Sequence, residues 1–313
     1  MGGGPAYDRS FIGMRAVAHG ISDVGLQREH NEDSFAVLSE HGLAIVADGM
    51  GGHRAGDVAS KLATEAIGEF FKKTANEDAT WPFHFDPNLS DEENKLLTSI
   101  RLANRQIFEH STRSQDLRGM GTTVVGALYS RKKNKMFLGH VGDSRAYRVR
   151  DGKIQQMTRD HSLVNDYLDA MPDMTDEQRS DLPKNVITRA LGMQDNVDVD
   201  IRSDECQKGD VYVLCSDGLS GMITDEEIAE IVRTTPDLNE VCRKLVVLAN
   251  EHGGEDNITA VAVRVEDDLP PKADLEFGKT QPGGVRSTRG ASGEDTPPAP
   301  TSVTDPAPPP SRP

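Results

Sequence analysis

Four aspartates stand at the ends of apolar runs typical of strands, each next to a turn-forming residue; they are Asp48, Asp143, Asp217 and Asp256. A turn alone explains any one of them, because Asp and Gly are common turn residues. Four together favour a metal site, since aspartates that meet at one sheet edge repel each other unless cations neutralise them. Oxygen ligands with no Cys and no nearby His pair indicate Mg²⁺ or Mn²⁺ and not zinc.

The glycine-rich stretch 46–57, VADGMGGHRAGD, raises the alternative of a phosphate-binding loop. Its glycines follow an apolar run and precede a helix pattern, but Arg54 stands where a dinucleotide loop requires glycine. The Gly-Lys-Ser/Thr of the Walker pattern is missing too. The metal interpretation is therefore the better one, and Gly49 would let a backbone carbonyl approach an ion closely.

A charged segment lies upstream, Arg28-Glu-His-Asn31-Glu32-Asp33. It could supply a side-chain cation that binds phosphoryl oxygens, which a carboxylate-held metal pair lacks. Most such runs are solvated loops. The guanidinium of Arg28, however, is a planar fork of donors that suits phosphoryl oxygens.

The elements that must position these residues are predicted from hydrophobic periodicity. It predicts helices over 56–73, from a capping box at Ser90, after a second capping box at Thr224, and along the stripe 238–249. It predicts strands over 34–38, 43–47, 123–129, 135–141, 146–150, 153–157, 210–215 and 259–265. The Asp-Gly pair between Arg150 and Lys153 predicts a tight hairpin, so at least part of the sheet is antiparallel. Strand runs with helices grouped between them indicate a layered α+β fold.

Residues 160–185 differ from the rest, because they are acidic, carry Met171, Pro172 and Pro183, and show only one short capped piece, at Thr175. Connections longer than about 12 to 15 residues are usually functional or disordered. We therefore expect a flap over about 162–185 that contacts substrate or a partner domain.

Composition bounds the domain organisation. The 313 residues include 17 prolines, 11 of them after Asp268, in a segment whose only aromatic residue is Phe277. Such a segment cannot bury enough apolar surface to fold. We expect an N-terminal extension at 1–13, a catalytic domain at 14–267 and a disordered Pro-rich tail at 268–313.

The formal charge of −16 makes nucleic acid and anionic membranes poor partners. No apolar run approaches the roughly 20 residues of a membrane span, and the first ten residues do not resemble a signal peptide. The three cysteines form neither a disulfide framework nor a C-x-x-C pair. We therefore expect a soluble protein of the reducing cytoplasm.

Eight blocks of residues occur in the order seen in type 2C metal-dependent serine/threonine protein phosphatases, the PPM family, and the chain resembles its bacterial-type members. The blocks are Arg28-x-x-Asn31-Glu32-Asp33, ADGMGGH at 47–53, MGTT at 120–123, VGDSR at 141–145, T-x-DHS at 158–162, ITRALG at 187–192, SDGL at 216–219 and Asp256-Asn257. The resemblance spans about residues 15–265.

The resemblance implies a four-layer α-β-β-α sandwich with two central antiparallel sheets. It also implies metal ligands. Asp48 would bridge two Mn²⁺ or Mg²⁺ ions, and the Gly49 carbonyl would bind one of them. Asp217 and Asp256 would hold the other, and Asp143 with Asp217 would hold a third, weaker ion.

The resemblance further implies that Glu32 and Asp33 order metal-bound waters. A water shared by two ions about 3.5 to 4 Å apart would lose a proton near neutral pH and attack phosphorus in line. Arg28 would take up charge on the phosphoryl oxygens, and no covalent phosphoenzyme is needed. The implied function is hydrolysis of phosphoserine and phosphothreonine in proteins, opposite a Ser/Thr kinase, by a monomer.

Four positions keep open roles. Many eukaryotic relatives place a histidine directly after the Asp-Gly pair, where it is proposed to protonate the leaving group, and this chain has Met50 there. His53 could serve, although a histidine in a glycine-rich turn is more often structural. Arg145 and Arg189 could bind phosphate, or equally pair with Asp or backbone groups inside the fold.

Two alternatives come from other functional classes. A non-catalytic relative would be a binding module that keeps the fold, but the retained Arg28, Asp48, Asp217 and Asp256 argue against it. A different two-metal phosphoesterase, such as a nuclease, is disfavoured by the negative charge.

Overall fold

The computed structural model describes residues 13–51, 55–75, 85–175, 178, 182–183 and 186–268. All of them belong to one unit, Met1–Pro270. His53, the predicted extension up to residue 12 and the predicted Pro-rich tail beyond Asp268 lie outside the described residues. The domain limits at 14 and 267 stay predictions.

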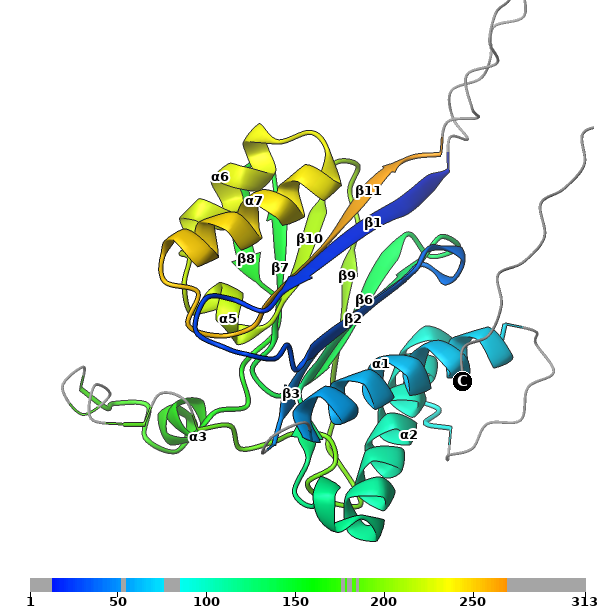
Figure 1. The fold of residues 1–313 in the computed structure, drawn as a ribbon. Helices are drawn as coiled ribbons and strands as arrows, with labels where there is room; N and C mark the ends of the chain where they lie inside the picture. Colours follow the sequence, from blue (N-terminus) through cyan, green and yellow to red (C-terminus); the bar gives the residue numbers. More distant parts are fainter. Residues whose placement is uncertain are drawn as a thin grey trace, which may run out of the picture. The chain divides into compact units, whose positions relative to one another are not determined.

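Two antiparallel sheets form the centre of this unit (Figure 1). The first has the strand order β1 (Met14–Asp23), β11 (Ile258–Asp267), β10 (Val211–Cys215), β7 (Arg145–Arg150) and β8 (Lys153–Gln156). The second has the order β2 (Asp33–Leu38), β3 (Leu43–Met50), β5 (Val124–Ser130), β6 (Lys135–Val141) and β9 (Asp200–Glu205). The short strand β4 (Gly121–Thr122) pairs with the end of β3.

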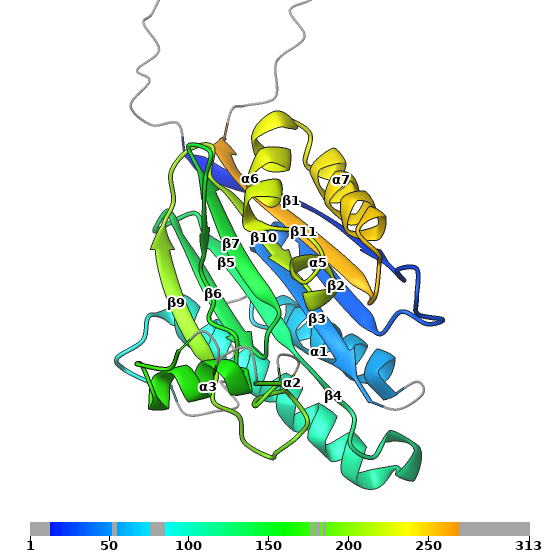
Figure 2. The same ribbon diagram turned by 90° about the vertical axis from the view of Figure 1, so that its left-hand side faces the viewer.

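Helices cover the outer face of each sheet, as the two views together show (Figures 1 and 2). On the second sheet lie α1 (Ala55–Lys73) and α2 (Asp91–Arg113), and on the first lie α6 (Asp225–Thr234) and α7 (Leu238–Glu251). Two shorter helices, α3 (Leu163–Ala170) and α5 (Asp217–Ser220), and two 3₁₀ turns, η2 (Ser39–His41) and η3 (Gln115–Leu117), complete the described elements.

Three apolar clusters hold these layers together. The central one joins the facing sides of the two sheets and includes Val46 and Leu138 from one sheet and Tyr212 and Val261 from the other. The outer two fill the space between α1, α2 and the second sheet and between α6, α7 and the first. Burying a Leu, Ile or Phe side chain contributes roughly 1.5–3 kcal/mol, so these clusters fix the layer order. The predicted four-layer α-β-β-α sandwich is confirmed.

Most predicted elements appear where the periodicity placed them. Ser90 caps α2, with its Oγ 3.4 Å from Glu93 N and Glu93 Oε2 2.8 Å from Ser90 N. The hairpin turns at Asp151 and Gly152, whose φ values are 50° and 73°. One expectation is wrong: the segment 160–185 holds more than the short capped piece, because its described residues include the helix α3, which is capped by Ser162. Gln178 N donates to Thr175 Oγ1 at 3.3 Å, as the predicted cap requires.

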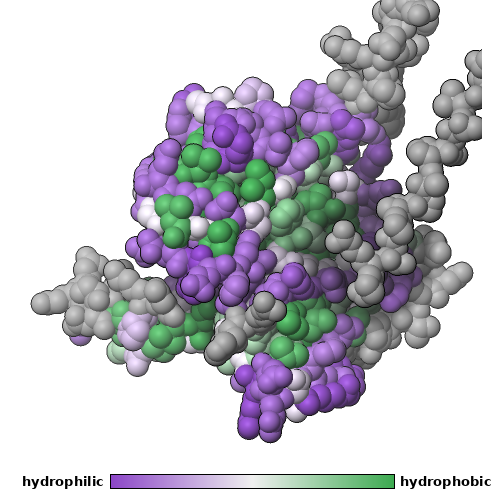
Figure 3. All heavy atoms as spheres, in the orientation of Figure 1, coloured by the Kyte–Doolittle hydropathy of each residue, from purple (hydrophilic) through white to green (hydrophobic). Residues whose placement is uncertain are grey.

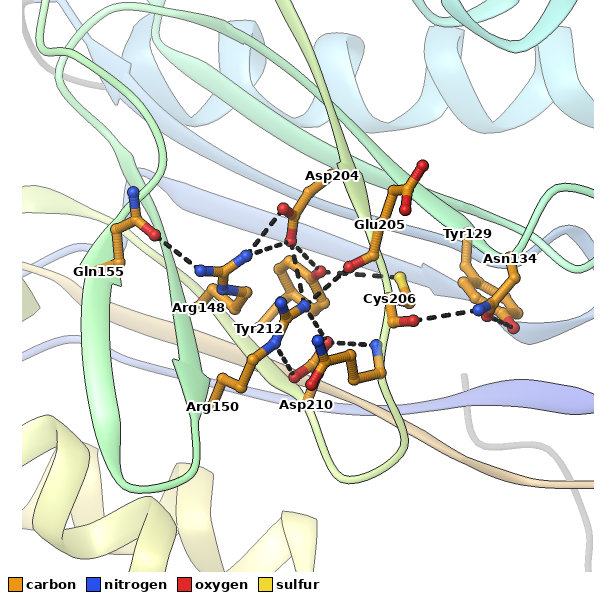
Figure 4. A network of polar contacts seen from close by, with 11 residues as sticks. Tyr129, Asn134, Arg148, Arg150, Gln155, Asp204, Glu205, Cys206, Asp210 and Tyr212 are labelled. Carbon is orange, nitrogen blue, oxygen red and sulfur yellow. Dashed lines mark hydrogen bonds and ion pairs between the residues drawn. The ribbon is translucent and has the colours of Figure 1, made fainter.

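A polar network ties the two sheets together at the strand ends remote from Asp48 and Asp217 (Figure 4). Arg148 Nη1 on β7 donates to both carboxylate oxygens of Asp204 on β9, at 2.8 and 2.9 Å. Tyr212 Oη on β10 donates to the same carboxylate at 2.6 Å, and Arg150 pairs with Asp210. The charge-assisted bonds of Arg148 and Tyr212 to Asp204 cross from one sheet to the other and fix their relative placement.

No described helix is long and apolar enough to cross a bilayer. The face drawn in Figure 3 mixes hydrophilic and hydrophobic residues and shows hydrophobic residues at the surface around α3.

Candidate metal centre

Asp48 and Asp33 are brought together by the pairing of β2 with β3, whose register sets them directly opposite each other. The main chain of Asp48 is held firmly. Its carbonyl accepts hydrogen bonds from Thr123 N and Thr122 Oγ1, both at 2.8 Å, and its amide donates to Thr123 Oγ1 at 3.1 Å. The two threonines therefore have a structural role: they fix the main chain of Asp48 at the end of β3. Their β-branched side chains are typical of strand residues.

The first sheet supplies Asp217 and Asp256. Asp217 is the first residue of α5, directly after β10, and Asp256 precedes β11. These two segments touch closely, because a Cβ on Gly218 would stand 2.1 Å from the carbonyl oxygen of Asn257. Only glycine at position 218 allows this approach.

Two hydroxyl groups from the first sheet bind Asp33 of the second sheet. Ser216 Oγ and Thr259 Oγ1 donate to Asp33 Oδ2 at 2.8 and 2.7 Å. Ser216 precedes Asp217, so the bond also aligns the start of α5 with β2. Asp33 Oδ1 has no partner among the described residues.

The loop before β2 is held by the side chain of Asn257. Its Oδ1 accepts from Glu32 N at 2.7 Å, and its Nδ2 donates to the carbonyls of Val24 and His30, both at 2.9 Å. Arg28 Nη2, on the same loop, donates to Asp256 Oδ2 at 2.7 Å. Asn257 thus determines where Arg28 and Glu32 lie.

Gly49 lies against this loop. Its amide donates to Glu32 O at 3.1 Å. A Cβ at this position would stand 2.1 Å from Gly56 O and 2.5 Å from Glu32 O. The predicted glycine is thus required by close backbone contact on two sides.

Asp143 reaches the same neighbourhood from the turn between β6 and β7. Gly142 before it has a φ of 106°, in the region that favours glycine, and donates its amide to His161 Nδ1 at 3.0 Å. Asp143 lies with Arg28, Asp217 and Asp256 in the wall of one cleft of about 420 Å³.

The pKa values of four site carboxylates lie above their ordinary range. Burial, and then the neighbouring carboxylates, raise the pKa of Asp33 and of Asp143 to about 7 and raise the pKa of Asp48 and Asp217 as well. Four buried oxygens of these acids have no hydrogen-bond partner among the described residues: Glu32 Oε1, Asp33 Oδ1, Asp143 Oδ1 and Asp217 Oδ1. Buried polar atoms are almost always paired in native proteins, so this set of oxygens fits a hard divalent cation.

The structure thus brings every residue of the predicted site into one region, and neighbouring carboxylates there raise the pKa of Glu32, Asp33 and Asp48. The residues of the predicted site are Arg28, Glu32, Asp33, Asp48, Gly49, Asp143, Asp217 and Asp256. The roles of Asn257, Ser216 and Thr259 as supports had not been predicted. Asn257 had a signal, because it lies beside Asp256 at the start of a strand.

The two arginines with open roles pair inside the fold. Arg145 forms a two-pronged ion pair with Asp160, with Nε–Oδ1 and Nη2–Oδ2 distances of 3.0 and 2.7 Å. Arg189 Nη1 donates to Asp200 Oδ1 at 2.9 Å and to the Asp198 carbonyl at 3.2 Å. Both contacts favour the structural alternative over phosphate binding.

A second group of residues has ligand-like spacing. One ligand atom from each of His140, His161 and Asp200 lies within 4.8 Å of the others. Arg189 Nη1, however, lies 3.1 Å from His161 Nε2 as well as 2.9 Å from Asp200 Oδ1. The guanidinium already supplies positive charge there, and His140 Nε2 lies 2.8 Å from the Arg159 carbonyl oxygen. This cluster is a structural contact and not a cation site.

A family model described as protein phosphatase 2C matches residues 27–258. The chain belongs to the protein phosphatase 2C family. The resemblance predicted from the eight motif blocks is therefore confirmed, and the match includes every residue of the predicted site.

Known members of the phosphatase 2C family match most of the chain. The serine/threonine phosphatase stp of Listeria welshimeri is 37% identical over 250 residues, which are 77% of this chain and 93% of that protein. A crystal structure of the Mycobacterium tuberculosis serine/threonine phosphatase PstP/Ppp has a TM-score of 0.67 at 36% identity and covers 81% of this chain and 99% of its own. A structure of the PstP catalytic domain in complex with 2 manganese ions has a TM-score of 0.68 at 35% identity, with coverages of 81% and 100%.

Proposed function

We propose that this chain is a Mn²⁺- or Mg²⁺-dependent phosphatase that hydrolyses phosphoserine and phosphothreonine in proteins. The observation that carries the proposal is the set of buried, unpartnered carboxylate oxygens, two of which belong to residues that line the 420 Å³ cleft. Family membership and the two manganese ions of the PstP catalytic domain support it.

The proposed ligands divide between the two sheets. Asp48, shared by two ions, and the Gly49 carbonyl would be the ligands from the second sheet. Asp217 and Asp256, from the first sheet, would hold the second ion, and Asp143 with Asp217 would hold a weaker third. Asp48, Asp143 and Asp217 carry like charges, and burial with neighbouring carboxylates raises their pKa values, which supports cations among them.

Glu32 and Asp33 act through water in this proposal. Two observations are consistent with that role. Asp33 Oδ2 accepts hydrogen bonds from Ser216 and Thr259, while Asp33 Oδ1 has no partner among the described residues. Glu32 has a buried Oε1 that also has no described partner. Each carboxylate thus offers one oxygen as a hydrogen-bond acceptor.

When bound, the ions supply a water that is acidic enough to act as the nucleophile at neutral pH. Arg28 binds the phosphoryl oxygens and stabilises the charge that develops on them. Its ion pair with Asp256 holds the guanidinium at the cleft before substrate arrives. Cysteine nucleophiles are disfavoured, because Cys206, Cys215 and Cys242 are buried and burial raises the pKa of their thiols to about 11, 12 and 11.

The substrates and setting follow from the same chemistry. Membership of the protein phosphatase 2C family and relatives named serine/threonine phosphatases support phosphoproteins, opposite a Ser/Thr kinase, as the substrates, and a charge of −16 disfavours nucleic acid. Three free cysteines suit a reducing cytoplasm. We propose a monomer that acts there.

The test is release of phosphate from p-nitrophenyl phosphate and from a phosphothreonine peptide, with and without Mn²⁺. The Asp217→Asn variant should lose both activities, whereas Asp116→Asn, at an exposed position, should keep them. Equal activity of Asp217→Asn and the parent would show that the metal mechanism is wrong.

A further inference from the structure

A second cavity, of about 310 Å³, lies beside the metal centre. Its described lining includes Met50, Ile187, Arg189, Ala190, Met193 and Val197. None of these residues belongs to the proposed metal ligands. Met50 lines this cavity, at the position where many eukaryotic relatives of the family have a histidine.

The cavity and the cleft lie on two sides of one pair of extended segments. Ser162 and Ile187 form a β-bridge, and Thr188 N donates to His161 O at 2.9 Å. Ser162 lines the metal cleft, whereas Ile187 and Thr188 line the second cavity. This ladder therefore joins one residue of the cleft wall to two residues of the cavity wall.

Met50 connects the cavity to the proposed bridging ligand directly. It follows Asp48 and Gly49 on β3, and consecutive Cα atoms are about 3.8 Å apart. The Cα atoms of Met50 and Asp48 therefore lie within about 8 Å of each other. An extended peptide advances about 3.3 Å per residue, so two or three residues span that distance.

Half of the described lining is apolar and half is polar, the polar members being Thr188, Arg189, Gln194, Asn196 and Asp198. A Cβ on Gly121 would stand 3.5 Å from Met50 Cγ and 3.4 Å from Met193 Sδ, so both methionine side chains gather over this glycine. Ile187, Ala190 and Val197 add further apolar surface. Unbranched methionines adapt to differently shaped apolar partners.

The one cation in the described lining is already engaged. Arg189 Nη1 bonds Asp200 Oδ1 and the Asp198 carbonyl. Met193, at the cavity, has 57% of its surface exposed, and Val186, next to the lining residue Ile187, has 40% exposed. Met193 is thus an exposed apolar side chain in the cavity wall that a ligand can reach.

We propose that this cavity receives an apolar side chain of the phosphoprotein substrate, at a position within three residues of the phosphorylated one. The inference rests on the proposed function and adds a sequence preference to it. A substrate chain is the occupant, because Met50 in the cavity wall lies two residues from Asp48, and the Ser162–Ile187 bridge joins the cavity wall to the wall of the cleft in which the phosphate would bind. Met50 and Met193 are then specificity residues that contact substrate away from phosphorus.

The test uses the full chain with Mn²⁺ and phosphothreonine peptides that carry either Leu or Gly at one position from −3 to +3. We expect kcat/KM to be about 10-fold higher for Leu at one of these positions. Met193→Ser should reduce this Leu-to-Gly ratio to about 1 to 3. Val247→Ser is the matched control, since Val247 is 42% exposed on α7, and it should keep the ratio of the parent.

A second readout follows the methionines themselves. With ¹³C-methyl methionine, the dephosphorylated Leu peptide should shift the methyl signals of Met50 and Met193 more than the Gly peptide does. This measurement does not depend on turnover, so it also covers a variant with altered activity.

The inference is overturned if the parent hydrolyses these peptides without preferring Leu at any position, or if Met193→Ser retains the full preference. Absence of a Leu preference combined with a change of oligomeric state in Met193→Ser would assign the surface to contact between copies of the chain. If the parent hydrolyses no phosphate ester at all, the proposed function itself fails and the inference with it.

Discussion

Asp33 on β2 lies directly opposite Asp48 on β3, so that two carboxylates of like charge face each other in the same antiparallel pair. Like charges directly opposite each other destabilise a sheet. Both groups have raised pKa values, mainly through burial and partly through neighbouring carboxylates. A cation bound at this sheet edge would therefore stabilise the folded protein.

The Asp48→Asn variant should bind Mn²⁺ at least 100-fold more weakly than the parent, because it removes the proposed bridging ligand. Its metal-free form should be more stable than the metal-free parent, since burial and neighbouring carboxylates raise the pKa of Asp48 and disfavour its charged form. Titration calorimetry with Mn²⁺ and thermal unfolding in EDTA check the two effects. Unchanged Mn²⁺ affinity would contradict the assignment.

Metal-free protein should lose stability as the pH rises from about 4 to about 7. The pKa of Asp33 and of Asp143 is about 7 in the folded protein, against an ordinary value of 3.8. In this window the folded protein binds more protons than the unfolded chain does, so the free energy of unfolding falls with pH and levels off above about 7. Unfolding in EDTA at pH 5 and pH 7.5 measures the fall, which should be smaller in Asp143→Asn. A parent no steeper than the variant would refute this coupling.

The Asn257→Ala variant should lose about 2–4 kcal/mol of unfolding free energy, because three hydrogen bonds to Glu32, Val24 and His30 disappear. The freed loop carries Arg28 and Glu32, so the Mn²⁺ concentration that half-saturates activity should rise. Asn239→Ala, at an exposed position of α7, is the matched control. A stable variant with unaltered Mn²⁺ dependence would show that Asn257 does not position the loop.

The Gly49→Ala variant should unfold at a markedly lower temperature than the parent and lose activity. Its new Cβ would stand 2.1 Å from Gly56 O and 2.5 Å from Glu32 O, and both are backbone atoms that cannot turn away. Gly68→Ala is the contrasting control, because its Cβ would meet only Leu38 side-chain carbons at 3.6–3.7 Å. That change in the middle of α1 should stabilise the protein by roughly 0.5–1 kcal/mol. Equal thermal midpoints for the two variants would refute the close packing at Gly49.

The Arg28→Lys variant should reduce kcat/KM for a phosphothreonine peptide by about 100-fold, because a lysine cannot present the planar fork of donors to phosphoryl oxygens. Mn²⁺ affinity should change little. Arg15→Lys is a close control, since the Arg15–Glu266 pair is as exposed (50% and 36%) as the Arg28–Asp256 pair (51% and 36%). A similar small loss in both variants would remove Arg28 from the phosphate site.

Elements with strong apolar periodicity were predictable from sequence. The strand predicted at 135–141 is observed at the same limits, because it is almost wholly buried. By contrast, β1 and β9 were not predicted. β1 is mostly half-buried, and β9 reads DIRSDE and pairs with β6 alone as an edge strand. Their structure is set by the strand beside them and not by their own pattern.

The acidic residues of the candidate site were predictable, because turn residues after apolar runs marked the same edge of a layered fold. The groups that hold them were not. Ser216 and Thr259 reach Asp33 across 183 and 226 residues of chain. Such contacts arise from the packing of one sheet on the other, which no local pattern encodes.

The order of strands in the first sheet bears on how the protein is made. β11, the last described strand, inserts between β1 and β10, and the turn before it carries Asp256. During synthesis from the amino end, β1 has no neighbour until residues 258–267 have left the ribosome. Because Asp256 is a proposed metal ligand, we expect a nascent chain to gain activity only after this last described strand has paired with β1 and β10.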